Sequence, residues 1–76
     1  MYLHIGKDYA INENNIIGIF NIETISKSKE YKNFIESIKK DLIDISDENQ
    51  KTLILVKDKF IKGYITNISS VTLKNR

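Results

Sequence analysis

The sequence predicts a small α+β domain: an antiparallel sheet or partial sandwich with one long amphipathic helix inserted between N-terminal and C-terminal strands. Three observations predict this class. First, residues 15–20 and 53–56 are apolar runs that do not alternate with polar residues. Second, apolar residues at helical spacing lie between these runs. Third, segments in which apolar and polar residues alternate lie near both ends of the chain. A chain of 76 residues is expected to form a single domain over residues 1–76. Folding at this size buries only about 60% of the unfolded surface, so we expect marginal stability.

The N-terminal segment predicts a β-hairpin. Leu3 and Ile5 alternate with polar neighbours, and residues 9–11 resume the strand pattern after Gly6. Gly6 supplies the positive φ that a three-residue connection commonly needs. Residues 12–15, which are rich in asparagine, then form a turn, because asparagine tolerates the left-handed region.

Residues 15–20 predict a central strand around which the rest of the chain is arranged. Four of these six residues are large and apolar and do not alternate with polar ones, which favours burial on both faces. In a crowded sheet, Gly18 lets another backbone or a bulky side chain come close. Residues 53–56, Leu-Ile-Leu-Val, are a second such run, and we expect a second strand buried on both sides.

Between the two strands the apolar period becomes helical. One stripe has spacings of 3, 1, 3, 4 and 3, and comprises Tyr31, Phe34, Ile35, Ile38, Leu42 and Ile45. Ser26 or Ser28 can cap the start of this predicted helix. Acidic residues gather near its end, where negative charge opposes the helix dipole, so we expect fraying after Ile45.

The last third predicts a second hairpin and a short helical turn. Residues 57–59 turn the chain, and residues 60–65 return with Phe60, Lys62 and Tyr64 on one face. Ser69 or Ser70 can cap a helical turn through residues 71–74.

The two apolar strands need cover on both faces of the sheet, but the single predicted helix can cover only one face. Either the sheet folds over itself into a small sandwich, or a second copy supplies the missing layer, and a short chain favours a mixture of both. The absence of cysteine excludes disulfides and thiolate metal sites, so association between copies is the expected substitute. The predicted interface residues are Ile17, Ile19, Phe60 and Tyr64.

The net charge of +2 hides an uneven distribution. Residues 1–50 carry six lysines against nine acidic residues, a balance of −3, whereas residues 51–76 carry five lysines and Arg76 against Asp58 alone, a balance of +5. This asymmetry fits contact with nucleic acid or another polyanion, while solvated lysines that protect an edge strand are the alternative. The candidate phosphate contacts are Lys51, Lys57, Lys59 and Lys62, and the aromatic residues Phe60 and Tyr64 are interleaved with this basic segment.

No residue pattern supports catalysis or metal binding. The only histidine, His4, has no cysteine and no carboxylate at ligand spacing, and the serine pair Ser69-Ser70 lacks a glycine elbow. The three glycines are too scattered for a phosphate-binding loop. We therefore expect no enzyme, no catalytic residue, no metal and no cofactor.

Apolar runs in the sequence reach only about five residues, far short of the roughly 20 that span a bilayer. The N-terminal residues also lack the basic and hydrophobic regions of a secretion signal. We expect a cytoplasmic protein without membrane contact.

Three blocks, residues 1–6, 16–20 and 68–76, together resemble the RemA/RemB family of bacterial extracellular-matrix regulators. The RemB branch is the closer match, and the resemblance covers residues 1–22 and 52–76. It implies a small cytoplasmic protein whose RemA branch activates transcription of matrix genes by binding DNA as a higher oligomer. The implied fold is similar to LytTR-type DNA-binding domains.

In the RemA branch, arginines contact DNA just before the central strand and, as a pair, before the strand that begins here near Thr52. Asn15 stands at the first position, and residues 49–51 keep a single positive charge on Lys51. A neutral amide can hydrogen-bond a phosphate but releases no counterion. The expected DNA contacts are Asn15, Lys51, Lys57, Lys59, Lys62 and Arg76.

Two functions of different classes follow from these observations. The first is a homo-oligomeric, DNA-associated transcriptional regulator whose lysines neutralise phosphates of double-stranded DNA. The alternative is a protein-interaction module, in which the sheet and the acidic helix face recruit or modulate another regulatory protein without direct DNA binding.

Overall fold

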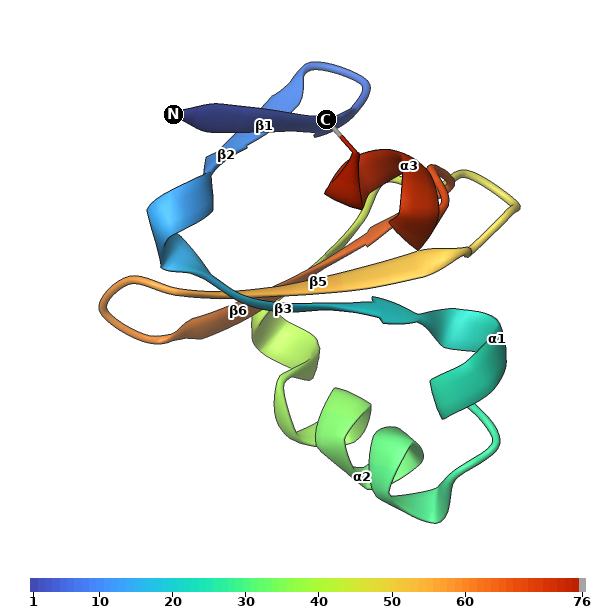
Figure 1. Cartoon of the computed structure of the whole chain (residues 1–76). Helices are drawn as coiled ribbons and strands as arrows, with labels where there is room; N and C mark the ends of the chain where they lie inside the picture. Colours follow the sequence, from blue (N-terminus) through green and yellow to red (C-terminus); the bar gives the residue numbers. More distant parts are fainter. Residues whose placement is uncertain (76) are drawn as a thin grey trace.

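The computed structural model describes residues 1–75 and has a four-stranded sheet between a two-stranded hairpin and a helical layer (Figure 1). The small sheet pairs β1 (Tyr2–Gly6) with β2 (Tyr9–Asn12). The large sheet has the strand order β3 (Ile16–Asn21), β5 (Thr52–Lys57), β6 (Ile61–Thr66) and β4 (Leu42–Asp44). The helical elements are η1 (Glu13–Asn15), α1 (Ile22–Ile25), α2 (Lys29–Ser37), η2 (Lys39–Asp41) and α3 (Ser70–Lys74). The α+β class is confirmed.

The N-terminal hairpin forms as predicted, with antiparallel strands β1 and β2. Gly6 has a φ of 128°, in the region that favours glycine. The connection is tighter than the three residues expected, because Gly6 itself pairs with Tyr9 and Lys7 takes a positive φ of 48°. Three buried apolar side chains of the hairpin belong to the hydrophobic core: Leu3, Ile5 and Ile11.

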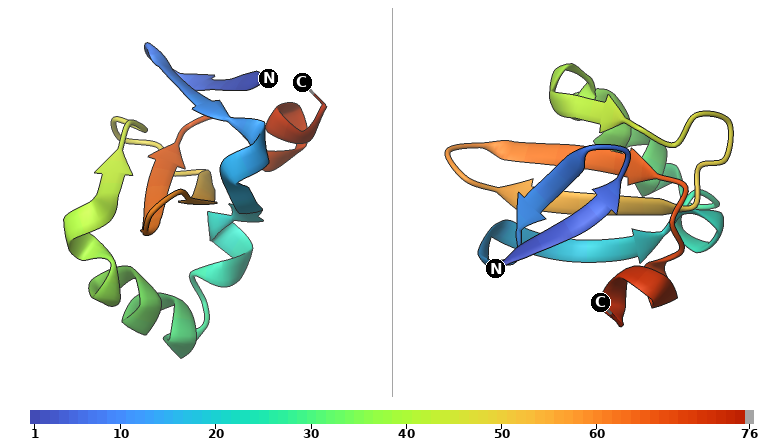
Figure 2. Two further views of the ribbon diagram at one scale, coloured as in Figure 1. Left: turned by 90° about the vertical axis from the view of Figure 1, so that its left-hand side faces the viewer. Right: turned by 90° about the horizontal axis from the view of Figure 1, so that it is seen from above.

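Two hydrophobic clusters cover the two faces of the large sheet, and Figure 2 shows the hairpin above the sheet and α2 below it. The first cluster joins the hairpin, α3 and the sheet through Leu3, Ile5, Ile11, Ile45, Ile54, Val56 and Leu73. The second cluster joins the sheet to α1 and α2 through Ile22, Leu53 and Ile65, with Ile25, Tyr31, Ile35, Leu42 and Leu55 packed against them. The chain therefore folds over itself, and its own hairpin and α3 provide the second layer that the sequence left open.

The prediction that residues 15–20 form a central strand is wrong, because β3 lies at the edge of the large sheet beside β5 alone. The two inner strands are β5 and β6, and Leu53 and Ile54 of β5 are buried in opposite clusters, as predicted for residues 53–56. A β-bulge explains the misleading pattern. Ile16 pairs with Val56 but Gly18 pairs with Leu55, so Ile17 is an extra residue that removes the alternation of an edge strand.

Gly18 has the role that the sequence suggested. A Cβ at this position would lie 2.6 Å from the Phe20 Cζ atom, so the Phe20 ring lies against the glycine backbone. The bulky group that comes close is therefore a neighbour two residues along the same strand, and both residues lie on the same face of β3.

The single helix predicted to reach Ile45 is wrong beyond Ser37. The chain leaves the helix at Ile38, which has φ −108° and ψ 16°, passes through η2, and forms β4 parallel to β6. Leu42 therefore continues the helical spacing by coincidence, since it lies in a strand. Because α2 ends at Ser37, the acidic residues after it do not lie at the C-terminal end of the helix, where they would oppose the helix dipole.

Side-chain caps begin each of the three α-helices. Ser28 accepts a hydrogen bond from the Tyr31 N–H at 3.1 Å, which confirms one of the two predicted caps of α2. Ser69 likewise caps α3, as one of the two serines predicted to do so. The short helix α1 was not predicted, although Asn21 caps it in the same way, and Ser26 ends that helix rather than beginning α2.

Buried hydroxyl groups tie the outer layers to the large sheet. The Thr66 hydroxyl donates to the Ile5 carbonyl oxygen at 2.5 Å, and the Thr52 hydroxyl donates to the Ile68 carbonyl oxygen at 2.7 Å. Both threonines are fully buried. These bonds satisfy carbonyl groups of the hairpin and of the segment before α3, which would otherwise be costly to bury.

Asp44 should give the fold part of its pH dependence. Burial raises the pKa of Asp44, but hydrogen bonds from the Ser46 hydroxyl and N–H and from the Gln50 amide outweigh it, so the pKa lies below its ordinary value. The group therefore stabilises the fold above its unfolded pKa of about 3.9, and this contribution is lost as the pH falls through the lower folded-state pKa. Urea unfolding of Asp44→Asn should depend less on pH below about pH 5 than wild type. Parallel pH profiles would contradict this assignment.

Candidate nucleic-acid interface

The predicted phosphate contacts lie at opposite ends of the large sheet. Lys51 immediately precedes β5 and Lys57 ends it. Because a strand rises by about 3.3 Å per residue, their Cα atoms lie roughly 20 Å apart. Lys59 and Lys62 lie with Lys57 on the hairpin between β5 and β6. The predicted lysines therefore lie in two separate places and do not form one cluster. Arg76 lies outside the described residues.

The hairpin tip, residues 57–62, is the more basic end. Within residues 1–75, its three lysines form no ion pair with a carboxylate. The Lys62 Nζ atom lies 5.1 Å from the centroid of the exposed Phe60 ring, a cation–π contact that leaves the ammonium donors accessible. Three ammonium groups and one carboxylate, Asp58, therefore make this turn locally positive.

A hollow of about 250 Å³ opens beside the hairpin tip. It lies between β1, β2, the end of β5 and β6. The turn between β5 and β6 beside it is at the left of Figure 1. Two of the predicted contacts, Asn15 and Lys62, line it together. Sequence reasoning missed its other polar and aromatic members, which come from distant parts of the chain: Tyr2, Asn12 and Asp58. We name this site the tip hollow.

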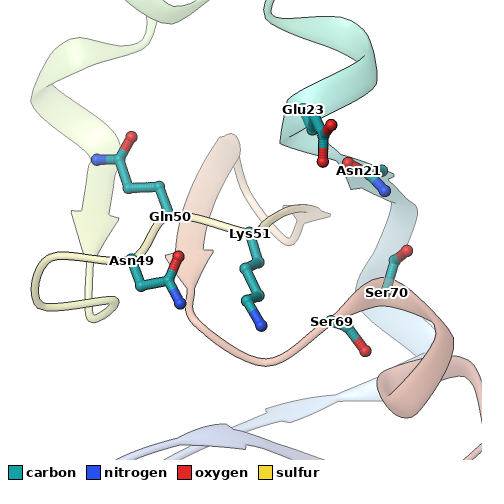
Figure 3. Close-up of a pocket in the computed structure, with 7 residues that line it drawn as sticks. All are labelled: Asn21, Glu23, Asn49, Gln50, Lys51, Ser69 and Ser70. Carbon is teal, nitrogen blue, oxygen red and sulfur yellow. The ribbon is translucent and has the colours of Figure 1, made fainter.

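Lys51 lines a second hollow of about 480 Å³ at the opposite end of the sheet (Figure 3). Its walls are polar and consist of Asn21, Glu23, Asn49, Gln50, Lys51, Ser69 and Ser70. Figure 3 shows Lys51 extending from the chain before β5 toward Ser69, with Asn21 and Glu23 on the facing wall. One ammonium group faces one carboxylate here, so this end offers a weaker positive field than the hairpin tip.

The whole chain matches a known protein family. The model of that family, described as extracellular matrix regulatory protein A-like, matches residues 2–76. The chain belongs to the RemA-like family. No curated protein matches the sequence significantly. The family match also includes α1, α2 and η2 between β3 and β4, where the resemblance noted in the sequence did not reach.

The residues predicted at an oligomer interface are not equally exposed in this RemA-like chain. Ile17 is 53% exposed on β3, and Phe60 is exposed at the hairpin tip. Ile19 and Tyr64 pack instead against the first cluster, and the Tyr64 ring meets Tyr9 edge-on with centroids 6.1 Å apart. Two of the four residues therefore contribute to the core of the chain itself.

The outer edge of β3 carries an apolar surface that the sequence did not delimit. Phe20 is 37% exposed and lines a shallow apolar hollow of about 240 Å³ between β3, β5 and α2. The apolar members of this hollow are Phe20, Ile25, Tyr31, Phe34, Leu53 and Leu55. In the part of the chain that the structure describes, no strand lies on the outer side of β3. We name the two exposed large apolar residues of β3, Ile17 and Phe20, the β3 edge patch.

Neither a metal centre nor a membrane span emerges from residues 1–75 of this RemA-like chain. Its acidic and imidazole side chains do not assemble in groups of three that could hold a metal ion. Its helices also fall short of the length and apolar character that crossing a membrane would need.

Proposed function

We propose that this RemA-like chain is a homo-oligomeric, DNA-associated transcriptional regulator of the extracellular-matrix regulator type, acting in the cytoplasm without catalytic activity. The observation that carries the proposal is the hairpin tip, where three lysines have no carboxylate partner within residues 1–75. Each lysine that contacts a DNA phosphate releases a condensed counterion, which gives affinity without reading the sequence.

The proposal assigns the primary DNA contact to Lys57, Lys59 and Lys62, with the Asn15 amide beside them. Lys51 lies roughly 20 Å from the hairpin tip along β5 and would contact a separate stretch of phosphates. The arrangement of sheet and helices is proposed to be of the LytTR type. The blocks at residues 1–6, 16–20 and 68–76 favour the RemB branch of the family.

Association between copies is the second part of the proposal, and the β3 edge patch is its surface. An edge strand that has exposed apolar side chains, and no strand on its outer side within residues 1–75, is a ready template for pairing with another copy. Association would also place several hairpin tips on one assembly. Weak phosphate contacts then act together, because the second contact becomes intramolecular.

A second candidate function is recruitment of another regulatory protein without direct DNA contact. The shallow apolar hollow beside the β3 edge patch favours this alternative, because exposed apolar surface of this kind is typical of protein contact sites. The neutral Asn15 favours it too, since an amide adds no charge to a phosphate contact. The two functions differ in the salt dependence of duplex binding.

Charge reversal at the hairpin tip tests the proposal. Lys57→Glu/Lys59→Glu should weaken binding to mixed-sequence duplex DNA by roughly tenfold or more and reduce the slope of log K against log salt by about two units. A matched control exists in the chain: Lys27 and Lys29 are equally spaced and also exposed, but Lys27 lies just before α2 and Lys29 begins it. Fluorescence anisotropy at salt concentrations from about 50 to about 200 mM measures both quantities.

The double variant Lys27→Glu/Lys29→Glu should bind duplex DNA nearly as wild type does. Equal losses in both double variants would mean that only net charge matters and that the hairpin tip is not the contact surface. Undetectable duplex binding by wild type, even at low salt, would favour the protein-recruitment function.

A further inference from the structure

The tip hollow is lined by groups that are not needed to bind a phosphate backbone. Two tyrosine rings, two carboxamides and one carboxylate surround it, from Tyr2, Tyr64, Asn12, Asn15 and Asp58. Aromatic rings offer stacking surfaces and carboxamides offer paired donors and acceptors, which are the groups that proteins use to hold unpaired bases.

We propose that the tip hollow binds the base of a nucleotide, preferentially guanine, while the phosphate of that nucleotide lies over the lysines of the hairpin tip. The ligand is either a free mononucleotide or an unpaired nucleotide of a single strand, which share this chemistry. The inference goes beyond duplex contact, because a base stacked within a duplex cannot enter a hollow.

The size of the hollow suits a base. Its volume of about 250 Å³ lies just below the roughly 300 to 1,000 Å³ of sites that hold drug-sized ligands. A planar base fits such a space, while the ribose and phosphate remain outside, near Lys62, which lines the hollow. Tyr64 provides a positioned ring, because Tyr9 packs edge-on against it with centroids 6.1 Å apart.

The polar groups favour guanine over the other bases. The carboxylate oxygens of Asp58 accept hydrogen bonds, and the two neighbouring donors of guanine, N1–H and the 2-amino group, match these two oxygens. The Asn12 Oδ1 atom already accepts from the Asn14 N–H at 3.0 Å, so the Asn12 amide group acts as a donor. Guanine O6 is an acceptor for such a donor. Uracil offers a single donor and cannot satisfy both carboxylate oxygens.

The charge around the hollow favours an anionic ligand. Lys57, Lys59 and Lys62 outnumber the single carboxylate of Asp58 along the hairpin tip. An organic cation could also stack on tyrosine rings, but three ammonium groups would repel it. A nucleotide uses both features, because its base needs the rings and its phosphate needs the lysines.

Titration calorimetry of the full chain with guanosine 5′-monophosphate, uridine 5′-monophosphate and inorganic phosphate tests the inference. We expect saturable binding of the guanosine nucleotide at least tenfold tighter than of the other two probes. Tyr2→Ala should weaken guanosine nucleotide binding by about 5- to 100-fold, the range measured for loss of one stacked base, whereas Tyr2→Phe should retain it. Tyr2 is 70% exposed, so neither variant should disturb the fold. Asp58→Asn should remove most of the preference for guanosine over uridine.

Equal affinities for the three probes, or unchanged binding in Tyr2→Ala, would overturn the inference. A guanine-containing pentanucleotide separates the two sources of ligand: tighter binding than the mononucleotide indicates a single strand, and weaker binding indicates a free nucleotide. Duplex binding is measured on the same variants. If the chain binds the guanosine nucleotide but no duplex, the proposed regulator function is rejected and the base site is retained. If it binds the duplex but not the guanosine nucleotide, the base site is rejected and the regulator function is retained.

Discussion

Replacing Ile5 with alanine is expected to lower the free energy of unfolding by about 2–5 kcal/mol. The Ile5 side chain is 0% exposed and belongs to the first cluster, where the hairpin covers the large sheet. Truncation removes buried methyl groups and leaves a cavity between the two layers. Since single domains are stable by only about 5–15 kcal/mol, and small ones lie near the lower limit, much of the population should unfold. Urea denaturation followed by circular dichroism measures the change.

Ile61→Ala is the matched control, because the same side chain is exposed at the start of β6. Its cost should stay below about 1 kcal/mol, as for most surface substitutions. Similar small costs for Ile5→Ala and Ile61→Ala would show that the hairpin is dispensable as a cover. The second layer of the sheet would then have to come from another copy of the chain.

Replacing Ile17 with lysine is expected to weaken association between copies by at least roughly tenfold. Ile17 is the bulged residue of β3 and lies on the proposed association surface with Phe20. A lysine there would bring an unpaired ammonium group into an apolar contact, and losing its hydration is costly. Because Ile17 is mostly exposed within one copy, the fold itself should tolerate the change. Sedimentation equilibrium over a micromolar concentration series measures the association constant.

Val71→Lys is the control for this experiment, since it also places a lysine at an exposed β-branched residue, here on α3. The two variants carry the same added charge, so a difference between them reports the position and not the net charge. Association that resists Ile17→Lys would move the interface away from the β3 edge patch. Association that only Val71→Lys abolishes would move it to α3, which packs beside β3. A wild-type chain that stays monomeric at all concentrations would reject the oligomeric part of the proposal.

Predictions that rest on neighbours in the sequence agree with the structure. The hairpin around Gly6, the start of α2 at Ser28 and the start of α3 at Ser69 depend on turn and capping groups within about four residues. Such interactions form in the same way wherever the segment lies in the fold. The sequence was therefore a sufficient guide to them.

The misplaced elements depend on pairing between distant segments. Residues 42–44 continue the helical stripe of α2, yet they gain backbone hydrogen bonds from β6, about 20 residues further along the chain. Local spacing carries no information about this partner. The edge position of β3 has the same cause, because an apolar run with a bulge resembles a strand buried on both faces.

The candidate site divides in the same way. The excess of lysine in residues 51–76 was visible in the sequence, and three of these lysines do lie together on the hairpin tip. The separation of Lys51 from them follows from the extended conformation of β5, which places its two ends far apart. The tip hollow needs Tyr2, Asn12 and Asp58 to meet, and no spacing along the chain predicts that.

The sequence by itself determined the α+β class, both hairpins, the starts of α2 and α3 and the basic character of the C-terminal third, because composition, period and capping act locally. Tertiary structure alone decided which strand is central, where α2 ends, which apolar residues remain exposed and which polar groups share a hollow. The physical reason is common to all four. Each depends on hydrogen bonds and apolar contacts between segments distant in sequence, and these form only when the whole sheet assembles.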